Sequence, residues 1–192
     1  MSMAAWGGFK MKIQEFKNLQ TKNLDLKPLV ATFDFANYLF DMITNNKEFF
    51  KFMPFADVEK PEEEFDFLRC AEEKWRNLSS AQYGMYLRKT GEFVGVCSIF
   101  DLSKGRDSGE IGYWLDPKFS GRGLMSEAVM AVSDAFFEMG CHRIQIVANI
   151  KNIASCKTAE KCGFEREGIM RRYVFNKYLN ENEDMALYAK IR

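Results

Sequence analysis

The sequence predicts an α/β fold in which a central mixed sheet is sandwiched between helices. Short runs of alternating apolar residues are typical of strands, and longer runs repeat apolar residues at helical spacing. The two kinds of segment are interleaved in the order strand, two helices, three strands, helix, strand, helix and closing strands. That order favours a mixed sheet with helices on its faces. The strand–helix–strand run over residues 108–148 is expected to form a right-handed parallel crossover.

The N-terminal half of the chain contains the first strand, two helices and a hairpin. Leu24–Val30 reads as a strand, and residues 34–46 carry apolar side chains at helical spacing. A second helix is expected to start at Pro61, because proline suits the first helical position and the three glutamates after it suit the positive end of the helix dipole. Residues 83–88 and 92–100 then form a hairpin around a glycine-containing turn.

The C-terminal half starts with a strand over Ser108–Leu115, which Asp116-Pro117 ends. Alternation places Ile111, Tyr113 and Leu115 on one face of this strand and the even-numbered residues on the other. The elements that follow are a helix over 122–139, a strand over 143–148, a helix over 153–162 capped by Asn152, and closing strands over 164–169, 173–178 and 184–191.

Composition limits the class of protein and its partners. The 192 residues are 47% hydrophobic and 28% charged, which is ordinary for one globular domain or at most two. Basic and acidic residues balance at 27 each, which argues against a nucleic-acid partner. No apolar run approaches the roughly 18 residues that span a bilayer, so we expect no membrane partner.

Cysteine and histidine usage predicts no metal site. The five cysteines form no Cys-x-x-Cys pair, and His142 is the only histidine, so no set of zinc ligands is present. Free thiols buried in a reducing cytosol are the expectation. Met1–Phe9 lacks the charged start and apolar core of a signal peptide, which also predicts a cytoplasmic protein. We expect residues 1–16 to form a flexible tail and 17–192 to form the domain.

A glycine loop, Ser120-Gly121-Arg122-Gly123-Leu124-Met125, joins the end of a strand to the start of a helix. The first amides of a helix lack internal partners and bind anions, and glycine lets a phosphate approach the backbone. Arg122 adds positive charge for a phosphate. Neither a Walker loop nor a complete Gly-x-Gly-x-x-Gly fingerprint is present. The alternative is an ordinary glycine-containing turn.

Amide and hydroxyl side chains follow the next strand. Asn149, Asn152 and Ser155 recur every three residues and lead into Ala159–Phe164. If this strand runs parallel to Ser108–Leu115, both carboxyl ends face one crevice, where open α/β sheets bind ligands. Helix capping is the alternative role for these side chains, and both roles are compatible.

The motifs around these loops resemble those of a known family. Residues 111–117 read Ile-Gly-Tyr-Trp-Leu-Asp-Pro, and with Ser120–Ala128 they resemble the acetyl-CoA motif of the Gcn5-related N-acetyltransferase (GNAT) superfamily. Further segments are similar to its RimJ/RimL-like branch of ribosomal-protein alanine N-acetyltransferases: Leu19–Pro28, Phe52–Phe55, Asn149–Phe164, Arg166–Arg171 and Glu183–Tyr188. The resemblance implies a twisted mixed sheet of about seven strands flanked by helices.

The resemblance also implies roles for particular residues in binding acetyl-CoA. The family separates its two central strands, so the backbone of Trp114 and Leu115 would pair with pantetheine. The amides from Gly121 to Met125 would hold the pyrophosphate, and Asn149 and Asn152 would contact the pantetheine arm. Acetyl-CoA is then a cosubstrate, and no metal is required.

The sequence departs from the family pattern at three positions. Ser120 stands where glutamine or arginine is usual, and Met125 stands where glycine or alanine is usual. Ala159 replaces the tyrosine that many members use to protonate the departing thiolate. Ser155 is the remaining hydroxyl nearby, with water as the alternative donor.

Acetyl transfer requires a neutral amine, and amines titrate near pH 8 at a chain terminus and near 10.4 in lysine. A carboxylate, directly or through water, can accept that proton, and we expect Glu110 to do so. The alternative is that Glu110 is a strand residue that faces solvent and has no catalytic role. A backbone amide of the same strand would polarise the thioester carbonyl. The phenylalanines around Pro54 either line the acceptor site or pack in the core.

The leading hypothesis is an acetyl-CoA-dependent N-acetyltransferase acting on an amine, either a protein N-terminus, such as that of a ribosomal protein, or a small amine or antibiotic. A non-catalytic acyl-CoA-binding or sensing module is the second hypothesis, suggested by the missing tyrosine. A nucleotide-binding regulator is the third. The sequence leaves homodimerisation open.

Overall fold

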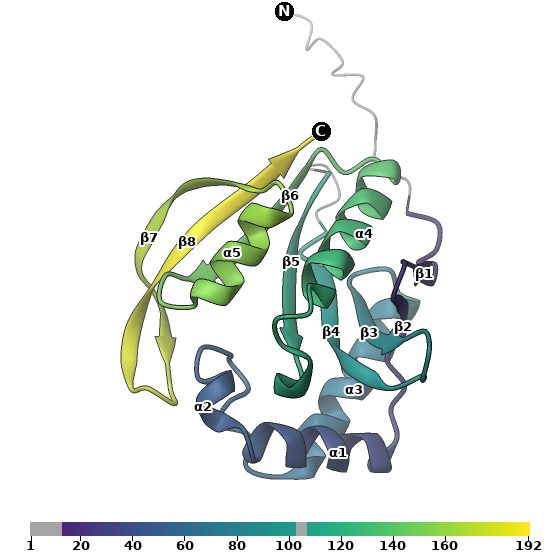
Figure 1. Ribbon diagram of the computed structural model, residues 1–192, viewed down its shortest axis with the longest axis vertical. Helices are drawn as coiled ribbons and strands as arrows, with labels where there is room; N and C mark the ends of the chain where they lie inside the picture. The colour runs from purple at the N-terminus through teal and green to yellow at the C-terminus, as the bar shows by residue number, and fades with distance from the viewer. Residues whose placement is uncertain (1–12, 103–106) are drawn as a thin grey trace, which may run out of the picture.

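The computed structural model describes residues 13–102 and 107–192, which form one mixed sheet with helices on both faces (Figure 1). The strands lie in the order β1-β2-β3-β4-β5-β6-β8-β7, and the only parallel neighbours among those described are β5 and β6. Their bounds are β1 Leu19–Gln20, β2 Leu24–Pro28, β3 Ala81–Leu87, β4 Phe93–Phe100, β5 Ser108–Leu115, β6 Arg143–Asn149, β7 Glu165–Asn176 and β8 Glu181–Ile191.

The helices divide between the two faces of the sheet, and a hydrophobic cluster lies under each group. The helices are α1 Phe33–Thr44, α2 Lys47–Phe50, α3 Pro61–Arg76, α4 Leu124–Glu138 and α5 Ile153–Lys161. On one face, α4 buries Val132 and Phe136 in the larger cluster, to which α5 also contributes. On the other, Leu39 of α1 and Leu68 of α3 pack with Trp114 of β5. The expected α/β sandwich with a mixed sheet is confirmed.

Most expected elements are present, and the closing strands differ from the expectation. The segments 164–169 and 173–178 form one strand, β7, whose register with β8 shifts between Met170 and Val174. Arg172 has φ +50°, and its amide donates to Asp184 Oδ1 at 2.7 Å. This bulge keeps the strand continuous where the polar Arg171-Arg172 pair reads as a break. The short elements β1 and α2 were not predicted from the sequence.

The expected N-terminal tail falls largely on residues 1–12, which lie outside the described residues. Phe16, within the last part of that expected tail, is buried and its ring contacts Trp75 and Phe136. The packed chain therefore extends at least to Phe16, one residue before the expected boundary.

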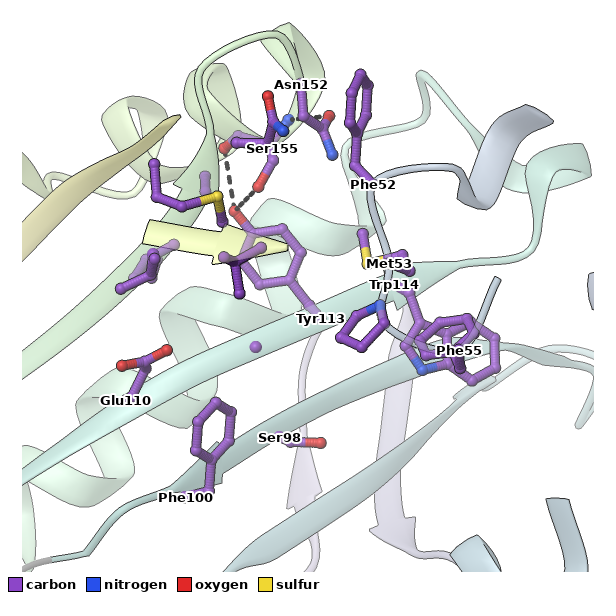
Figure 2. A pocket seen from close by; sticks show the side chains of 18 of the residues that line it. Phe52, Met53, Phe55, Ser98, Phe100, Glu110, Tyr113, Trp114, Asn152 and Ser155 are labelled. Carbon is purple, nitrogen blue, oxygen red and sulfur yellow. Dashed lines mark hydrogen bonds between the residues drawn. The ribbon is translucent and has the colours of Figure 1, made fainter. Parts of the chain in front are cut away.

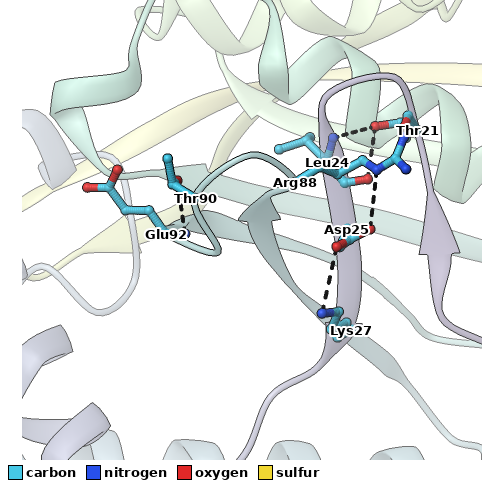
Figure 3. Close-up of polar contacts among 7 residues, drawn as sticks. All are labelled: Thr21, Leu24, Asp25, Lys27, Arg88, Thr90 and Glu92. Carbon is cyan, nitrogen blue, oxygen red and sulfur yellow. Dashed lines mark hydrogen bonds and ion pairs between the residues drawn. The ribbon is translucent and has the colours of Figure 1, made fainter.

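The hairpin turn after β3 lies where the sequence predicts it, next to polar contacts on strand β2 (Figure 3). Gly91 N donates to Leu87 O at 2.7 Å, and Glu92 N donates to Thr90 Oγ1 at 3.3 Å. Asp25 forms ion pairs of 3.7 Å with Lys27 and with Arg88. Such partly exposed pairs contribute about 1 kcal/mol or less, so these contacts have a local structural role.

Candidate functional site

Strands β5 and β6 separate partway along their length and leave an opening in the middle of the sheet. They pair at only three positions, from Ser108 opposite Arg143 to Glu110 opposite Gln145. Beyond Glu110, β5 pairs only with β4 and β6 only with β8 in the described part of the chain. The backbone of residues 111–115 therefore has no strand partner on its β6 side, and an extended ligand can pair there.

A cavity of about 780 Å³ lies at this opening (Figure 2). That volume is in the usual range for a small-molecule site. Its walls come from the loop after α2, from β4, β5, β6 and β7, and from the start of α5, and they include Phe52, Phe55, Ser98, Glu110, Tyr113, Trp114, Asn149, Asn152 and Ser155. The structure thus gathers the expected catalytic residues, Trp114 and both asparagines around one cavity.

The glycine loop leads from β5 into α4. Gly121 and Gly123 both have φ +75°, a left-handed conformation that costs other residues about 1–2 kcal/mol. Gly123 is the N-cap of α4, and Glu127 N donates to its carbonyl. The amides of Leu124–Ser126 have no helical acceptor at this first turn, so they are available to an anion.

The other residues expected to bind the cofactor contribute in different ways. The side chains of Leu124 and Met125 are buried, and that of Leu115 packs against the larger cluster, so these residues offer only backbone groups. Arg122 donates to Lys118 O at 3.0 Å and lies over the Phe119 ring. Its guanidinium is therefore folded back over the turn.

Lys161 is a cation near the loop that sequence reasoning missed. Its Nζ lies 3.9 Å from the position that a Cβ on Gly123 would occupy. The last turn of α5 thus places a positive charge beside the free amides of α4. No local sequence signal marks Lys161, because its proximity depends on how α5 packs beside α4.

The two asparagines have different environments. Asn149 is 3% exposed, and its Oδ1 accepts a hydrogen bond from Lys151 N at 2.7 Å. Its buried Nδ2 has no hydrogen-bond partner among the described residues. Leaving such a donor unsatisfied costs about 1–3 kcal/mol, so this amide suits a carbonyl acceptor on a ligand. Asn152 caps α5 by accepting from Ser155 N at 3.2 Å, which confirms its expected capping role.

Ser155 is hydrogen-bonded to Tyr113, a residue that the sequence-based prediction did not include in the site. Figure 2 shows the Tyr113 ring pointing from β5 towards α5. Its hydroxyl donates to Ser155 O at 3.0 Å and accepts from Ser155 Oγ at 3.1 Å. Burial raises the pKa of Tyr113 above its ordinary value, so its phenol stays protonated at neutral pH. A phenol is therefore present in the cavity although Ala159 replaces the family's usual tyrosine.

Glu110 lies where β5 and β6 begin to separate. Its carboxylate accepts a hydrogen bond from Gln145 Nε2 at 2.8 Å. Burial raises the pKa of Glu110, the bond from Gln145 opposes that rise, and the charge of Asp101 adds to it. A half-buried carboxylate with a raised pKa is suited to accept a proton near neutral pH. This environment differs from that of a solvent-facing strand residue.

The phenylalanines around Pro54 have both of the roles that the sequence left open. Phe50 is buried in the core, whereas Phe52 and Phe55 line the cavity. Trp114 contacts Phe55, with ring centroids 5.7 Å apart. The backbone of β4 approaches that of β5 closely at Gly95, because a Cβ there would collide with the Trp114 carbonyl oxygen. One wall of the cavity is therefore aromatic and lies over tightly packed strands.

Comparisons with known proteins agree with this geometry. Residues 23–165 match the model of the acetyltransferase (GNAT) domain family. The chain is 37% identical over 94 residues to the "Probable N-acetyltransferase YjcK" of Bacillus subtilis (strain 168), covering 48% of this chain and 52% of that protein. It is 33% identical over 105 residues to the ribosomal-protein-serine acetyltransferase of Escherichia coli (strain K12), covering 54% and 57%. The chain thus spans about half the length of these two curated relatives.

A solved structure has the same fold. RimL, a ribosomal L7/L12 alpha-N-protein acetyltransferase in complex with coenzyme A, superimposes with a TM-score of 0.81. The sequence identity is 23%, and the match covers 91% of this chain and 98% of that chain. None of the helices that the structure describes has both the length and the apolar composition needed to cross a bilayer.

Proposed function

The chain belongs to the GNAT acetyltransferase family, and from this premise we propose that it transfers the acetyl group of acetyl-CoA to an amine by direct attack in a ternary complex. The separation of β5 and β6 is the observation that carries the proposal, because it exposes unpaired backbone beside free helix N-terminal amides. An extended arm that ends in phosphates matches both features.

The residues around the opening fit acetyl-CoA. The backbone of Leu115 would pair with pantetheine amides, whereas the Trp114 carbonyl is turned towards Gly95 of β4. Asn149 Nδ2 would supply a buried donor for the same arm. The amides from Gly121 to Met125, with Lys161 beside them, suit the pyrophosphate. Asn152 lines the cavity while it caps α5, and Arg122 adds charge at the loop.

Glu110 and Ser155 would move the protons of the reaction. When bound, acetyl-CoA supplies an activated thioester carbonyl. Glu110 would accept the proton that the amine loses as its nitrogen forms a bond to the acetyl carbon. Ser155 would turn its hydroxyl proton from Tyr113 to the sulfur as the carbon–sulfur bond breaks, and solvent would replace that proton. The products are an amide and the free thiol of CoA.

The proposed acceptor is an amine that enters through the aromatic side of the cavity, either the N-terminal amine of a protein or a small amine. Two of the similar proteins carry ribosomal-protein names, which favours an N-terminal amine. Acetyl-CoA consumption with release of free thiol, measured over a panel of peptides and small amines, tests the proposal. Tight CoA binding with no turnover on any of them would instead support a binding module.

Ser155→Ala is expected to lower kcat by about 100-fold, since general-acid assistance typically contributes 10²–10⁴. The KM for acetyl-CoA should change little, because Ser155 protonates the leaving thiolate and does not hold the arm. Steady-state kinetics measure both quantities.

Thr158→Ala is the matched control for that substitution. Thr158 also carries a hydroxyl on α5, but it does not line the cavity and it donates to Ala154 O. Its loss should leave kcat unchanged. Tyr113→Phe keeps the ring and removes both hydrogen bonds to Ser155, and we expect a smaller loss of about tenfold. If the Ser155→Ala variant keeps full activity, water and not Ser155 protonates the leaving thiolate.

A further inference from the structure

A second cavity of about 500 Å³ adjoins the first one. The two share Pro54, Phe55, Asp57, Phe67, Trp114 and Lys177 in their linings, so the loop after α2 and the Trp114 ring lie between them. The second cavity is therefore placed to receive the far end of an acceptor whose amine lies in the first.

The lining of the second cavity is strongly acidic. Asp57 and Glu59 come from the loop after α2, Glu63 and Glu64 come from α3, and Lys177 follows β7. Four carboxylates thus face one ammonium group. Ile43, Val58 and the rings of Phe67 and Trp114 complete the walls. Carboxylates between apolar and aromatic walls suit an alkylammonium group, whose charge pairs with acids and whose methylenes pack on the rings.

Glu64 sets this cavity apart from an ordinary acidic surface. Its side chain is buried, with 6% of its surface exposed, and it lines the cavity. It forms no hydrogen bond or ion pair with any residue that the structure describes. Burying an unpaired carboxylate is costly, so a cation in the cavity would relieve the cost.

Helix capping does not account for Glu64. The N-cap is Lys60, and Glu64 forms no hydrogen bond with the residues described in the first turn. The exposed Glu63 accepts a hydrogen bond through Oε1 from Glu59 N, which precedes the helix, at 3.3 Å. Glu62, also exposed, adds a second negative charge to the first turn of α3. The helix would therefore keep a favourable acidic N-terminus without a buried glutamate.

We propose that the second cavity is an acidic subsite, in which Glu64, Asp57, Glu59 and Glu63 bind a second cationic group of the acceptor while its reacting amine lies beside Trp114. This inference rests on the proposed acetyltransferase function and narrows the acceptor to a dication. A diamine and a peptide with lysine after its N-terminal residue both present that chemistry.

Binding of the cationic group is measured first, without turnover. Calorimetry with 1,4-diaminobutane and with butylamine, each added to the CoA-bound protein, should show at least tenfold tighter binding of the diamine. Glu64→Gln should bring the two affinities within about twofold of each other, and Asp57→Asn should reduce the difference partially. Glu62→Gln, an exposed change on the same helix turn, should leave the difference intact. Equal binding of the two amines to the unmodified protein, or a preference that survives Glu64→Gln, would overturn the proposal.

The pH dependence gives a second measurement. Burial raises the pKa of Glu64 to about 7, and the charge of Glu63 adds to the rise. A cation binds the ionised form, so diamine affinity should rise about tenfold from pH 6 to pH 8, with Asp57, Glu59, Glu63 and Lys177 also facing the ligand. The rise should be absent in Glu64→Gln, and an unchanged rise in that variant would contradict the assignment.

Turnover measurements then show which kind of acceptor carries the cationic group. They also show whether the subsite or the acetyltransferase function is the proposal that fails. Comparing kcat/KM for 1,4-diaminobutane with that for a Ser-Lys peptide identifies which acceptor fits, and butylamine and a Ser-Met peptide are the neutral-tailed controls. A preference for the cationic member of each pair supports the subsite. Turnover of all four acceptors at similar rates would contradict the subsite and support the acetyltransferase function. If the protein binds the cationic acceptors more tightly but acetylates none of the four, the subsite is supported and the proposed acetyltransferase function is contradicted.

Discussion

Gly123→Glu is expected to weaken CoA binding by at least 100-fold, which corresponds to about 2.7 kcal/mol. Gly123 is the N-cap of α4 with φ +75°, so any side chain there is strained and projects from the loop that leads into the free amides. A glutamate would add negative charge where we propose that the phosphates bind, and it would pair with Lys161, whose Nζ lies 3.9 Å from the new Cβ. Calorimetric titration with CoA measures the loss.

Two comparisons separate the charge effect from backbone strain. Gly123→Ala imposes the same left-handed conformation without a charge, so it should cost about 1–2 kcal/mol of stability and weaken CoA binding far less than glutamate does. Acetyl-pantetheine, which lacks the nucleotide and its pyrophosphate, should be used equally well by both variants. Unchanged CoA affinity in Gly123→Glu would place the phosphates elsewhere.

The sequence predicts this loop well because its signals are local. The strand Ser108–Leu115 has the expected bounds, since alternation and the Asp116-Pro117 stop are contiguous in the chain. The N-cap of α5 at Asn152 and the parallel pairing of β5 with β6 follow from short-range capping and from crossover geometry. These features are sufficient to locate the opening and the helix start with its free amides.

The missed parts of the site depend on packing between distant segments. Tyr113 meets Ser155 only because α5 packs on β6 within reach of the Tyr113 side chain of β5, and nothing near either residue in the sequence marks the contact. In the sequence, Glu64 resembles an ordinary acidic residue at a helix start. Only the folded chain brings it together with the loop after α2 in the lining of one cavity. The break expected in β7 has the same origin, because the contact between Arg172 N and Asp184 keeps a polar pair within the strand. Such burial follows from the assembled fold, which one sequence does not reveal.

Glu110→Gln is expected to lower turnover by about 100-fold at neutral pH while CoA affinity stays unchanged, because a general base typically contributes 10²–10⁴ and Glu110 lies away from the glycine loop. The base works only when ionised, and burial raises its pKa, so wild-type activity should fall as pH drops through that raised pKa. The amine must also lose its proton, so log kcat/KM should approach a slope of two below both pKa values. In Glu110→Gln the slope should fall to one.

Gln145→Leu tests whether Glu110 is a general base or a residue that only shapes the opening. The hydrogen bond from Gln145 Nε2, 2.8 Å long, lowers the pKa of Glu110 against the effect of burial. Removing it should raise that pKa further and move the acidic limb of the pH–rate profile to higher pH, with the maximum rate reached in alkaline solution nearly preserved. A structural role for Glu110 predicts lower activity at every pH with no movement of the limb. Gln145 of β6 lies opposite Glu110, outside the unpaired stretch of β5, so this substitution leaves the proposed pantetheine-binding backbone intact. A shift of the acidic limb would therefore identify Glu110 as the carboxylate that accepts the amine's proton.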